Sequence, residues 1–332
     1  MARRSWYCIR TESKRQPSYD IAVERSILEP AGIRVESVDM DDPVAFERAA
    51  PLVDAVLHSR GILDAARIDR LIKCRIIAHY GTGVDRVDVA AATARGIWVT
   101  NGPLYAVDEV SSHAIALLLA VTRKIVAADR AVRSGQWHIK PVVPLRRIAG
   151  RTLGLLGFGN IARATGRKGR ALGLDVMAHD PYLDEAVFRS EHARSVDFKT
   201  CVSESDILSI HLPLTPATRG IVSREAIAMM KPDAVLVNTS RGPVVDEPAL
   251  VDALREGRLA GAGLDVFAEE PLRADHPLLS LPNVTVSGHI GFYSEESIKQ
   301  GQRDAAQQVV EALQGRPPAF LVNRQVLERP SR

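Results

Sequence analysis

Three side chains suited to acid and base chemistry follow predicted strands in the second half of the sequence. They are Arg241, Glu270 and His289. An arginine guanidinium pairs with a carboxylate through two parallel hydrogen bonds and stays charged. A histidine titrates near neutral pH, and an adjacent carboxylate raises its pKa so that it carries a proton. The set suits hydride transfer to a 2-oxo acid, in which a cation binds the carboxylate and polarises the carbonyl while an acid protonates the new alkoxide.

Each of these residues also has a simpler interpretation. Taken singly, any of them could form an interface salt bridge or cap the end of a strand. Their combination at the ends of neighbouring strands favours chemistry. Glu269 competes with Glu270 for contact with the histidine. Because neighbours in an extended segment point in opposite directions, only one of the two carboxylates can face the site.

A predicted strand, a glycine-rich turn and a helix lie upstream of these residues. Thr152 to Leu156 has the pattern of a buried strand, and Gly157-Phe-Gly-Asn-Ile-Ala162 follows it. Two glycines permit a tight turn and close approach of the backbone to a pyrophosphate, and the small alanine allows the helix to pack against the strand. The N-terminus of the helix would face the phosphates. The alternative for the glycine pattern alone is an ordinary strand-to-helix turn.

An acidic residue strengthens the interpretation of the glycine turn as a cofactor site. A second apolar run, residues 174–178, ends close to Asp180. This is near the spacing of about 20 residues expected for a carboxylate that accepts from both ribose hydroxyls. Because such an acid repels a 2′-phosphate, the sequence predicts NAD rather than NADP.

The elements that must position these residues form an α/β pattern. In the first hundred residues, predicted strands alternate with predicted helices, which indicates a parallel sheet. A long apolar helix is predicted for Val107 to Arg133, and a last helix for Glu295 to Leu313. Ligands bind at the carboxyl ends of the strands in open α/β sheets. The predicted strands cover residues 53–57, 76–79, 97–100, 207–211, 234–238, 263–267 and 284–286, and the two early helices cover residues 21–28 and 62–72.

Composition places the chain among ordinary soluble proteins. It has 332 residues, 46% hydrophobic and 25% charged, with a net charge of +3. This length favours about two domains, and the composition favours neither disorder, nor a membrane protein, nor a nucleic-acid partner. The basic run Arg163 to Arg170 is predicted to be a solvated helix face. Cys8, Cys74 and Cys201 lack metal-like spacing, so we predict buried free thiols, no metal and a cytoplasmic location.

Taken together, these motifs resemble the D-isomer-specific 2-hydroxyacid dehydrogenases over nearly the whole chain. The glycine turn with Asp180, the segment 238–242, Glu270-Pro271 and His289 carry the resemblance. The segments 288–297 and 180–183 are most similar to the C-terminal-binding-protein branch and its bacterial relatives. The resemblance implies two Rossmann-like/flavodoxin-like parallel-sheet domains. An NAD domain of residues 104–291 would be inserted into a discontinuous substrate domain of residues 1–103 and 292–332, and the helix from Val107 would form the contact of a homodimer, or of a tetramer.

The resemblance also assigns roles to particular residues. Arg241 would bind the substrate and polarise its carbonyl, His289 would donate the proton, and Glu270 would be its partner. Glu270 stands where the similar formate dehydrogenases have glutamine, so formate oxidation is disfavoured. Substrate contacts would come from His79, Gly81 and Phe292. Cofactor contacts would come from Thr82, Gly157, Phe158, Gly159, Asn160, Ile161, Ala162, Asp180, Leu212, Pro213, Thr218, Thr239, Ser240 and Asp265, the last toward the carboxamide.

Three positions depart from the pattern of the branch. His79 replaces an arginine that faces the substrate, although it could simply end a strand; Gly288 replaces a proline, and Phe292 replaces a tryptophan and could equally be a core residue. The sequence therefore predicts an NAD-dependent D-2-hydroxyacid dehydrogenase acting on a small 2-oxo acid, with no membrane partner. The alternative is an NAD-sensing, partner-binding protein of co-repressor type.

Overall fold

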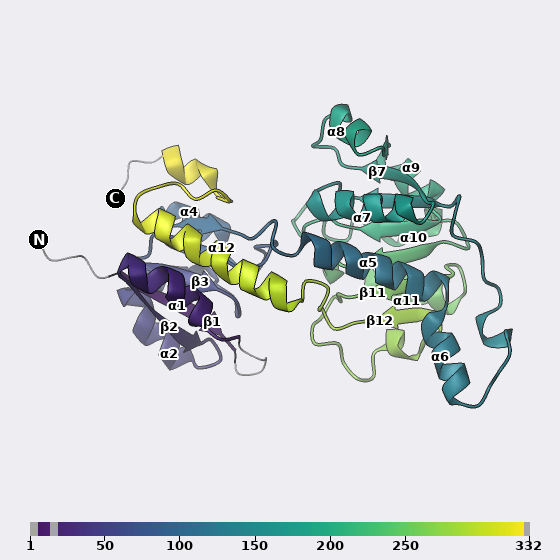
Figure 1. Cartoon of the computed structure of the whole chain (residues 1–332), viewed down its shortest axis with the longest axis horizontal. Helices are drawn as coiled ribbons and strands as arrows, with labels where there is room; N and C mark the ends of the chain where they lie inside the picture. Colours follow the sequence, from purple (N-terminus) through teal and green to yellow (C-terminus); the bar gives the residue numbers. More distant parts are fainter. Residues whose placement is uncertain (1–5, 14–18, 329–332) are drawn as a thin grey trace, which may run out of the picture. The chain divides into compact units, whose positions relative to one another are not determined.

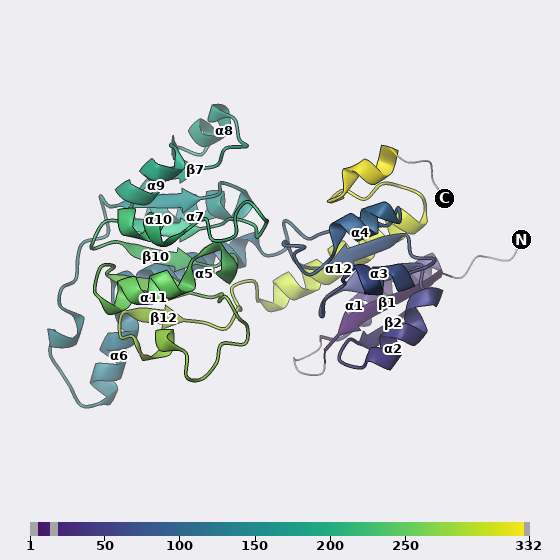
Figure 2. The ribbon, with the colours of Figure 1, turned by 180° about the vertical axis from the view of Figure 1, so that it is seen from behind.

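The structure is a computed structural model that describes residues 6–13 and 19–328. The described chain forms two compact units (Figures 1 and 2). Unit 1 contains the described residues up to Ala106 together with those from Ser294 onward, and unit 2 is Val107–Tyr293. Each unit is built on a parallel sheet covered by helices on both faces, so the predicted α/β class with two parallel sheets is confirmed.

Unit 1 contains a five-stranded sheet in the order β2-β1-β3-β4-β5. This is the flavodoxin-like order of doubly wound folds. The strands are β1 (Trp6–Glu12), β2 (Ile33–Asp39), β3 (Ala55–His58), β4 (Ile76–His79) and β5 (Trp98–Thr100). The helices are α1 (Ala22–Leu28), α2 (Pro43–Ala49), α3 (Ala65–Arg70), α4 (Val89–Ala94) and α12 (Glu295–Leu313).

Successive residues of these strands bury their side chains in two different cores. Ile76 and Ala78 of β4 pack in the core that contains α1 and α12, whereas Ile77 packs in the core that contains α2, α3 and α4. This follows from the alternation of side chains across a strand. Aspartates begin the helices on the second face, since the side chains of Asp42 and Asp64 accept hydrogen bonds from the first turns of α2 and α3.

Unit 2 contains a seven-stranded sheet in the order β12-β11-β10-β9-β6-β7-β8. The order reverses between β6 and β9, as at the switch point of a Rossmann fold, where dinucleotides bind. The strands are β6 (Thr152–Leu156), β7 (Asp175–His179), β8 (Arg194–Ser195), β9 (Ile207–Ile210), β10 (Val235–Asn238), β11 (Gly261–Leu264) and β12 (Val284–Val286).

Helices cover both faces of this sheet. The helices α5 and α7 share one core with residues of β6 and β7, and α9, α10 and α11 pack in the other. The helices are α5 (Val107–Thr122), α6 (Ile125–Arg133), α7 (Asn160–Ala171), α8 (Glu185–Ser190), α9 (Phe198–Glu204), α10 (Arg224–Met229) and α11 (Glu247–Arg255). Short 3₁₀ helices occur at Glu29–Ala31, Ala50–Leu52, Lys140–Val142, Gly242–Val244, Pro277–Ser280 and Arg324–Glu328.

The prediction of a single helix from Val107 to Arg133 is wrong. The helix ends at Thr122, Lys124 adopts a left-handed conformation with φ of 51°, and α6 continues at an angle of 59°. Val121 lies against Gly261, the first residue of β11, so α5 ends where the sheet beneath it ends. Among the described residues, no single helix is long and apolar enough to cross a membrane.

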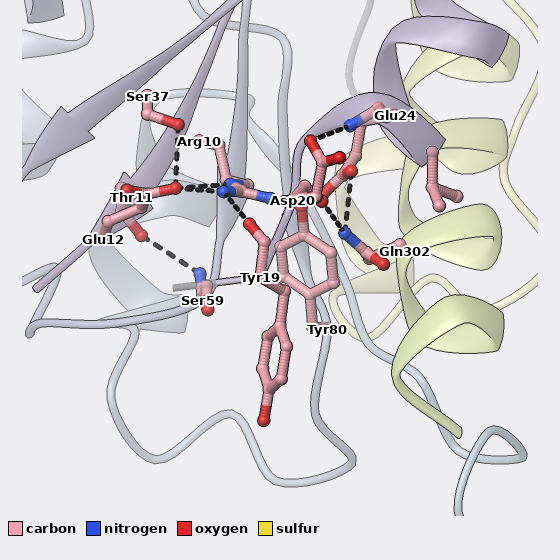
Figure 3. A network of polar contacts seen from close by, with 12 residues as sticks. Arg10, Thr11, Glu12, Tyr19, Asp20, Glu24, Ser37, Ser59, Tyr80 and Gln302 are labelled. Atoms are coloured by element: carbon pink, nitrogen blue, oxygen red, sulfur yellow. Dashed lines mark hydrogen bonds and ion pairs between the residues drawn. The ribbon is translucent and has the colours of Figure 1, made fainter. Parts of the chain in front are cut away.

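A buried ion pair ties four elements of unit 1 together (Figure 3). The carboxylate of Glu24 on α1 is fully buried and accepts hydrogen bonds from Arg10 Nη1 (3.1 Å), Tyr80 Oη (2.6 Å) and Gln302 Nε2 (2.9 Å). Burial and this carboxylate raise the pKa of Tyr80 well above its ordinary value. Burying a carboxylate costs several kcal/mol unless hydrogen-bond donors surround it. The donors come from β1, the segment after β4, and α12.

Removing this carboxylate should destabilise unit 1. In Glu24→Ala the Arg10 guanidinium loses its fully buried partner, so the free energy of unfolding should fall by about 3 kcal/mol. Urea denaturation followed by circular dichroism would measure the loss. Glu29→Ala is the control, because the Arg25–Glu29 pair is exposed and such pairs contribute about 0–1 kcal/mol. Equal effects of the two substitutions would contradict the role of the network.

Candidate active site

The glycine turn after β6 has the geometry expected of a phosphate-binding turn. Gly157 has φ of +83°, and a Cβ atom there would lie 2.9 Å from the carbonyl oxygen of His211. Only glycine fits at this crossing of the loops after β6 and β9. Apart from its own chain neighbours, no heavy atom of the described residues lies within 4 Å of a Cβ placed on Gly159, the N-cap of α7. The N-terminus of this twelve-residue helix therefore opens onto free space at the switch point, where an anion is favoured.

Asp180 reaches the same turn from the end of β7. Its Oδ2 accepts from the backbone N–H of Phe158 at 2.9 Å, and its Oδ1 accepts from the N–H of Tyr182 at 3.1 Å. The Phe158 side chain points away from the edge into the core, where it stacks on Phe188 at 5.0 Å. Asn160, Ile161 and Ala162 form the first turn of α7. The predicted carboxylate and glycine turn are therefore brought together.

Apart from Asp265, the remaining predicted cofactor residues of unit 2 follow β9 and β10. Thr218 donates to the carbonyl of Pro213 at 2.6 Å and so closes the loop 212–218. Thr239 follows β10, and its hydroxyl is buried with no hydrogen-bond partner among the described residues. A buried polar atom without a partner fits a site where a ligand supplies one. These residues fit a dinucleotide cofactor.

The turn that carries Arg241 is held by the side chain of Asn238. The Asn238 Oδ1 accepts from the N–H and hydroxyl of Ser240, and its Nδ2 donates to the carbonyl of Arg241. A Cβ atom on Gly242 would lie 1.9 Å from the carbonyl carbon of Phe267, so the backbones after β10 and β11 touch here. Glycine at 242 thereby brings the arginine turn against the segment that carries Glu270.

His289 and Glu270 form a hydrogen-bonded pair. The distance from His289 Nδ1 to Glu270 Oε2 is 2.8 Å, and Glu270 Oε1 accepts from the N–H of Phe267. Because the carboxylate only accepts, Nδ1 carries the hydrogen and Nε2 is left to exchange a proton. Phe292 stands edge-on to the imidazole, with ring centroids 6.3 Å apart. Of the two neighbouring glutamates, Glu270 makes the contact.

Asp265 holds the loop on which His289 lies. Its side chain is buried, and it accepts from Ser287 Oγ (2.6 Å) and from the N–H groups of Ile290 (3.0 Å) and Gly291 (2.8 Å). Burial alone would raise the pKa of Asp265, but the nearby His113 together with the hydrogen bonds from Ser287 and these N–H groups outweighs burial and lowers it. Asp265 is a predicted cofactor contact, whereas the sequence pattern gives no prediction for His113 or Ser287.

The predicted residues of unit 1 lie at the end of β4 and directly after it. His79 ends the strand, and its Nδ1 lies 2.9 Å from both the carbonyl oxygen and the Nδ1 of His58. Thr82 donates to the carbonyl of Gly102 at 2.9 Å. A Cβ atom on Gly81 would lie 2.8 Å from His79 Nε2, so glycine allows the loop to fold over the imidazole. Burial and the nearby His79 lower the pKa of His58 well below its ordinary value.

Other predicted features lie away from these loops. In the basic run of α7, Arg167 pairs with Glu191 and Lys168 pairs with Asp108. The three cysteines are buried free thiols. Among the described residues, no group of three or more histidine, cysteine or acidic side chains is arranged to hold a metal ion.

Comparison with known proteins identifies the family. Residues 115–291, more than half of the chain, match the model of the D-isomer specific 2-hydroxyacid dehydrogenase, NAD binding domain. The chain belongs to the D-isomer-specific 2-hydroxyacid dehydrogenases. Unit 2 therefore contains the NAD-binding domain of this dehydrogenase, and the predicted nicotinamide dinucleotide cofactor is confirmed.

Relatives of this dehydrogenase cover most of its length. It is 40% identical to a glyoxylate reductase of Thermococcus litoralis, over 80% of this chain and 82% of that one. It is 39% identical to a D-3-phosphoglycerate dehydrogenase of Mycobacterium leprae, over 85% of this chain but about half (53%) of that one. The structure of a glyoxylate reductase from Paecilomyes thermophila matches with a TM-score of 0.88 and 28% identity, covering 97% of this chain and 99% of that one.

These comparisons confirm the predicted class of enzyme. The chain is an NAD-dependent oxidoreductase that interconverts 2-oxo acids and 2-hydroxy acids, and the co-repressor alternative is not favoured. The similarity to the C-terminal-binding-protein branch remains a prediction.

Proposed function

We propose that this dehydrogenase reduces a small 2-oxo acid to its D-2-hydroxy acid, with Arg241, Glu270 and His289 as the catalytic residues. The observation that carries the proposal is the 2.8 Å contact between His289 Nδ1 and Glu270 Oε2. It stands at the edge of the sheet that also carries the glycine turn and the Arg241 turn. A histidine oriented by a carboxylate is the arrangement that general acid catalysis requires.

Each residue has a defined task in this reaction. A bound reduced nicotinamide supplies the hydride that reaches the carbonyl carbon. The Arg241 guanidinium binds the substrate carboxylate and attracts electron density toward the carbonyl oxygen. As the carbon–oxygen π bond breaks, its electron pair moves to the oxygen, which takes a proton from His289 Nε2. Glu270 accepts a hydrogen bond from His289 Nδ1 and so fixes the orientation of the ring.

We propose glyoxylate and hydroxypyruvate as the substrate class. Relatives named glyoxylate reductase, at 39% and 40% identity, support this choice. Phe292 stands edge-on to the proton donor and would form an apolar wall beside the substrate. We further propose that unit 1 is the substrate domain, contributing His79 and Gly81 to the substrate and Thr82 to the cofactor.

The roles of the three catalytic residues can be tested by turnover. NADH consumption with glyoxylate, hydroxypyruvate and phenylpyruvate should show activity with at least one acid. His289→Ala should lower kcat by about 10²–10⁴-fold, because it removes the general acid, and Arg241→Ala should lower kcat/KM strongly. Glu270→Gln should also lower kcat, whereas the matched control Glu269→Gln should not. Tight NADH binding without turnover of any acid would favour the partner-binding alternative, and full activity of His289→Ala would contradict the mechanism.

Asp180 should determine the preference for NADH over NADPH. Its carboxylate stands beside the glycine turn, where it would accept from the ribose hydroxyls and repel a 2′-phosphate. In Asp180→Ala the ratio of kcat/KM for NADH to that for NADPH should fall roughly tenfold or more, as expected when one charge–charge repulsion of about 1.4 kcal/mol is removed. Asp184→Ala, an exposed acid of the same segment, is the control. An unchanged ratio would place Asp180 away from the ribose.

We propose that the protein is a homodimer and that α6 and the segment after it form the contact. Ile125, Val132, Trp137, Ile139 and Val143 are all exposed apolar residues, and Trp137 is 87% exposed. Contiguous exposed apolar side chains indicate an interface. One face of α5, the other part of the predicted contact helix, packs in the core of unit 2 through Ala114, Leu117, Leu118 and Val121. Buried free thiols support the proposed cytoplasmic location.

The oligomeric state can be measured by sedimentation equilibrium. The wild-type protein should sediment with twice the mass of the chain, and Trp137→Glu combined with Ile139→Glu should shift it toward the monomer. Tyr182→Glu is the control, because Tyr182 is equally exposed (89%) but follows β7. A dimer or tetramer that survives the double substitution would place the contact on another surface.

A further inference from the structure

The helix α5 runs along β11 toward the loop that carries His289. Val121 of α5 lies against Gly261, the first residue of β11, and Leu117 lies against Gly263. Four residues of a helix advance about 6 Å, and two residues of a strand advance about 6.6 Å. One further step along both elements brings His113 to Asp265, where the His113 Nε2 to Asp265 Oδ1 distance is 3.4 Å. The helix therefore delivers His113 to the carboxyl end of the strand.

His113, Ser287 and Asp265, here called the Asp265 cluster, form a chain of hydrogen bonds whose direction is fixed. Ser287 Oγ lies 2.6 Å from Asp265 Oδ1, and His113 Nε2 lies 2.7 Å from Ser287 Oγ. A carboxylate with a lowered pKa accepts only, so the serine hydroxyl must donate to it. The serine oxygen then accepts from His113, whose Nε2 carries the hydrogen.

The carboxylate at the end of this chain determines the path of the backbone on both sides of His289. Besides accepting from Ser287, Asp265 accepts from the N–H groups of Ile290 and Gly291, and its carbonyl oxygen accepts from the N–H of His289 at 2.7 Å. His289 itself has φ of 55°, a left-handed conformation that is unfavourable for a residue with a side chain. Such a conformation persists only where the surrounding contacts hold it.

We propose that His113 and Ser287 are positioning residues for the proton donor His289 and act through the carboxylate of Asp265. This inference rests on the proposed role of His289. Without the hydroxyl, Oδ1 loses a strong donor, and the carboxylate is free to turn toward the remaining N–H groups. The loop 287–291 then changes its path, and the imidazole moves relative to the substrate. A displacement of about 1 Å at a reacting group can cost about a hundredfold in rate.

Matched substitutions separate this role from simple packing. Ser287→Ala should lower kcat about tenfold or more, as a misplaced acid does, with KM and the NADH dissociation constant changed less than about threefold, since the loss falls in the transition state. His113→Phe keeps a ring but removes the donor, and should give a similar loss. His113→Gln keeps an N–H donor at the end of its side chain and should recover most of the activity. Ser190→Ala on α8, which removes an exposed hydroxyl, is the control.

The double substitution tests whether the two residues form one chain. Because both act on the same carboxylate, His113→Phe combined with Ser287→Ala should be no slower than the slower single variant by more than about twofold. Two losses that multiply would contradict the proposed chain. Values of kcat within twofold of wild type, together with a lowered urea midpoint, would mean that these contacts only hold the fold.

His289→Ala in the same assay distinguishes failure of this inference from failure of the proposed function. If His289→Ala retains the wild-type kcat, the proton donor is wrongly assigned and this inference fails with it. If His289→Ala is inactive while the variants of the Asp265 cluster are fully active, only the positioning role is overturned.

Discussion

A buried carboxylate at the end of β11 determines the shape of the loop on which the proposed chemistry depends. Asp265 is removed from water, which by itself disfavours its charge. The charge is retained because a hydroxyl and two backbone N–H groups donate to it. These donors belong to Ser287, Ile290 and Gly291, on both sides of His289. The hydrogen bonds that stabilise the Asp265 charge therefore also fix the conformation of this loop. His289 can then hold a left-handed backbone that it would not adopt alone.

Close contacts between loops turn the carboxyl edge of the sheet into a site. In a parallel sheet, every strand ends at the same edge, so the residues after β6, β9, β10, β11 and β12 are neighbours. Glycines decide how closely these loops approach. Gly157 allows the loop after β6 to touch that after β9, and Gly242 allows the turn after β10 to touch the segment after β11. Any larger residue at either position would separate the side chains that the site needs together.

Local sequence pattern was sufficient to predict the parts of the fold that are themselves local. The buried strand β4 and the glycine turn with Asp180 were predicted, because apolar runs and turn residues are read over a few positions. The predicted strand 263–267 begins two residues later than β11 (Gly261–Leu264), since Gly261 and Ala262 lack the bulky side chains of a strand pattern. The glycines of β11, Gly261 and Gly263, allow α5 to pack closely against the strand. Because α5 lies about 140 residues earlier in the chain, a local pattern cannot show this contact.

What the sequence could not show depends on partners distant in the chain. The strand β1 contains Arg10 and Glu12, so its sequence does not have the pattern of a buried strand. Arg10 is nevertheless buried, because it donates to the buried carboxylate of Glu24. Gln302, from the far end of the chain, donates to the same carboxylate. His113 likewise sits within an apolar helix pattern, and its partner Ser287 is 174 residues away. The residues in recognisable motifs could be named from the sequence, whereas His113 and Ser287, which contact Asp265, could not.

Each unit holds its predicted site residues through a buried carboxylate of its own. In unit 1, Glu24 binds Tyr80, which stands between His79 and Gly81 in the chain. In unit 2, Asp265 binds the residues on both sides of His289. Loss of one hydrogen-bond donor to a buried carboxylate is strongly destabilising, because the cost of removing the charge from water is then no longer offset. These carboxylates therefore hold their donors firmly in place. The loop positions in each unit are therefore set by contacts within that unit.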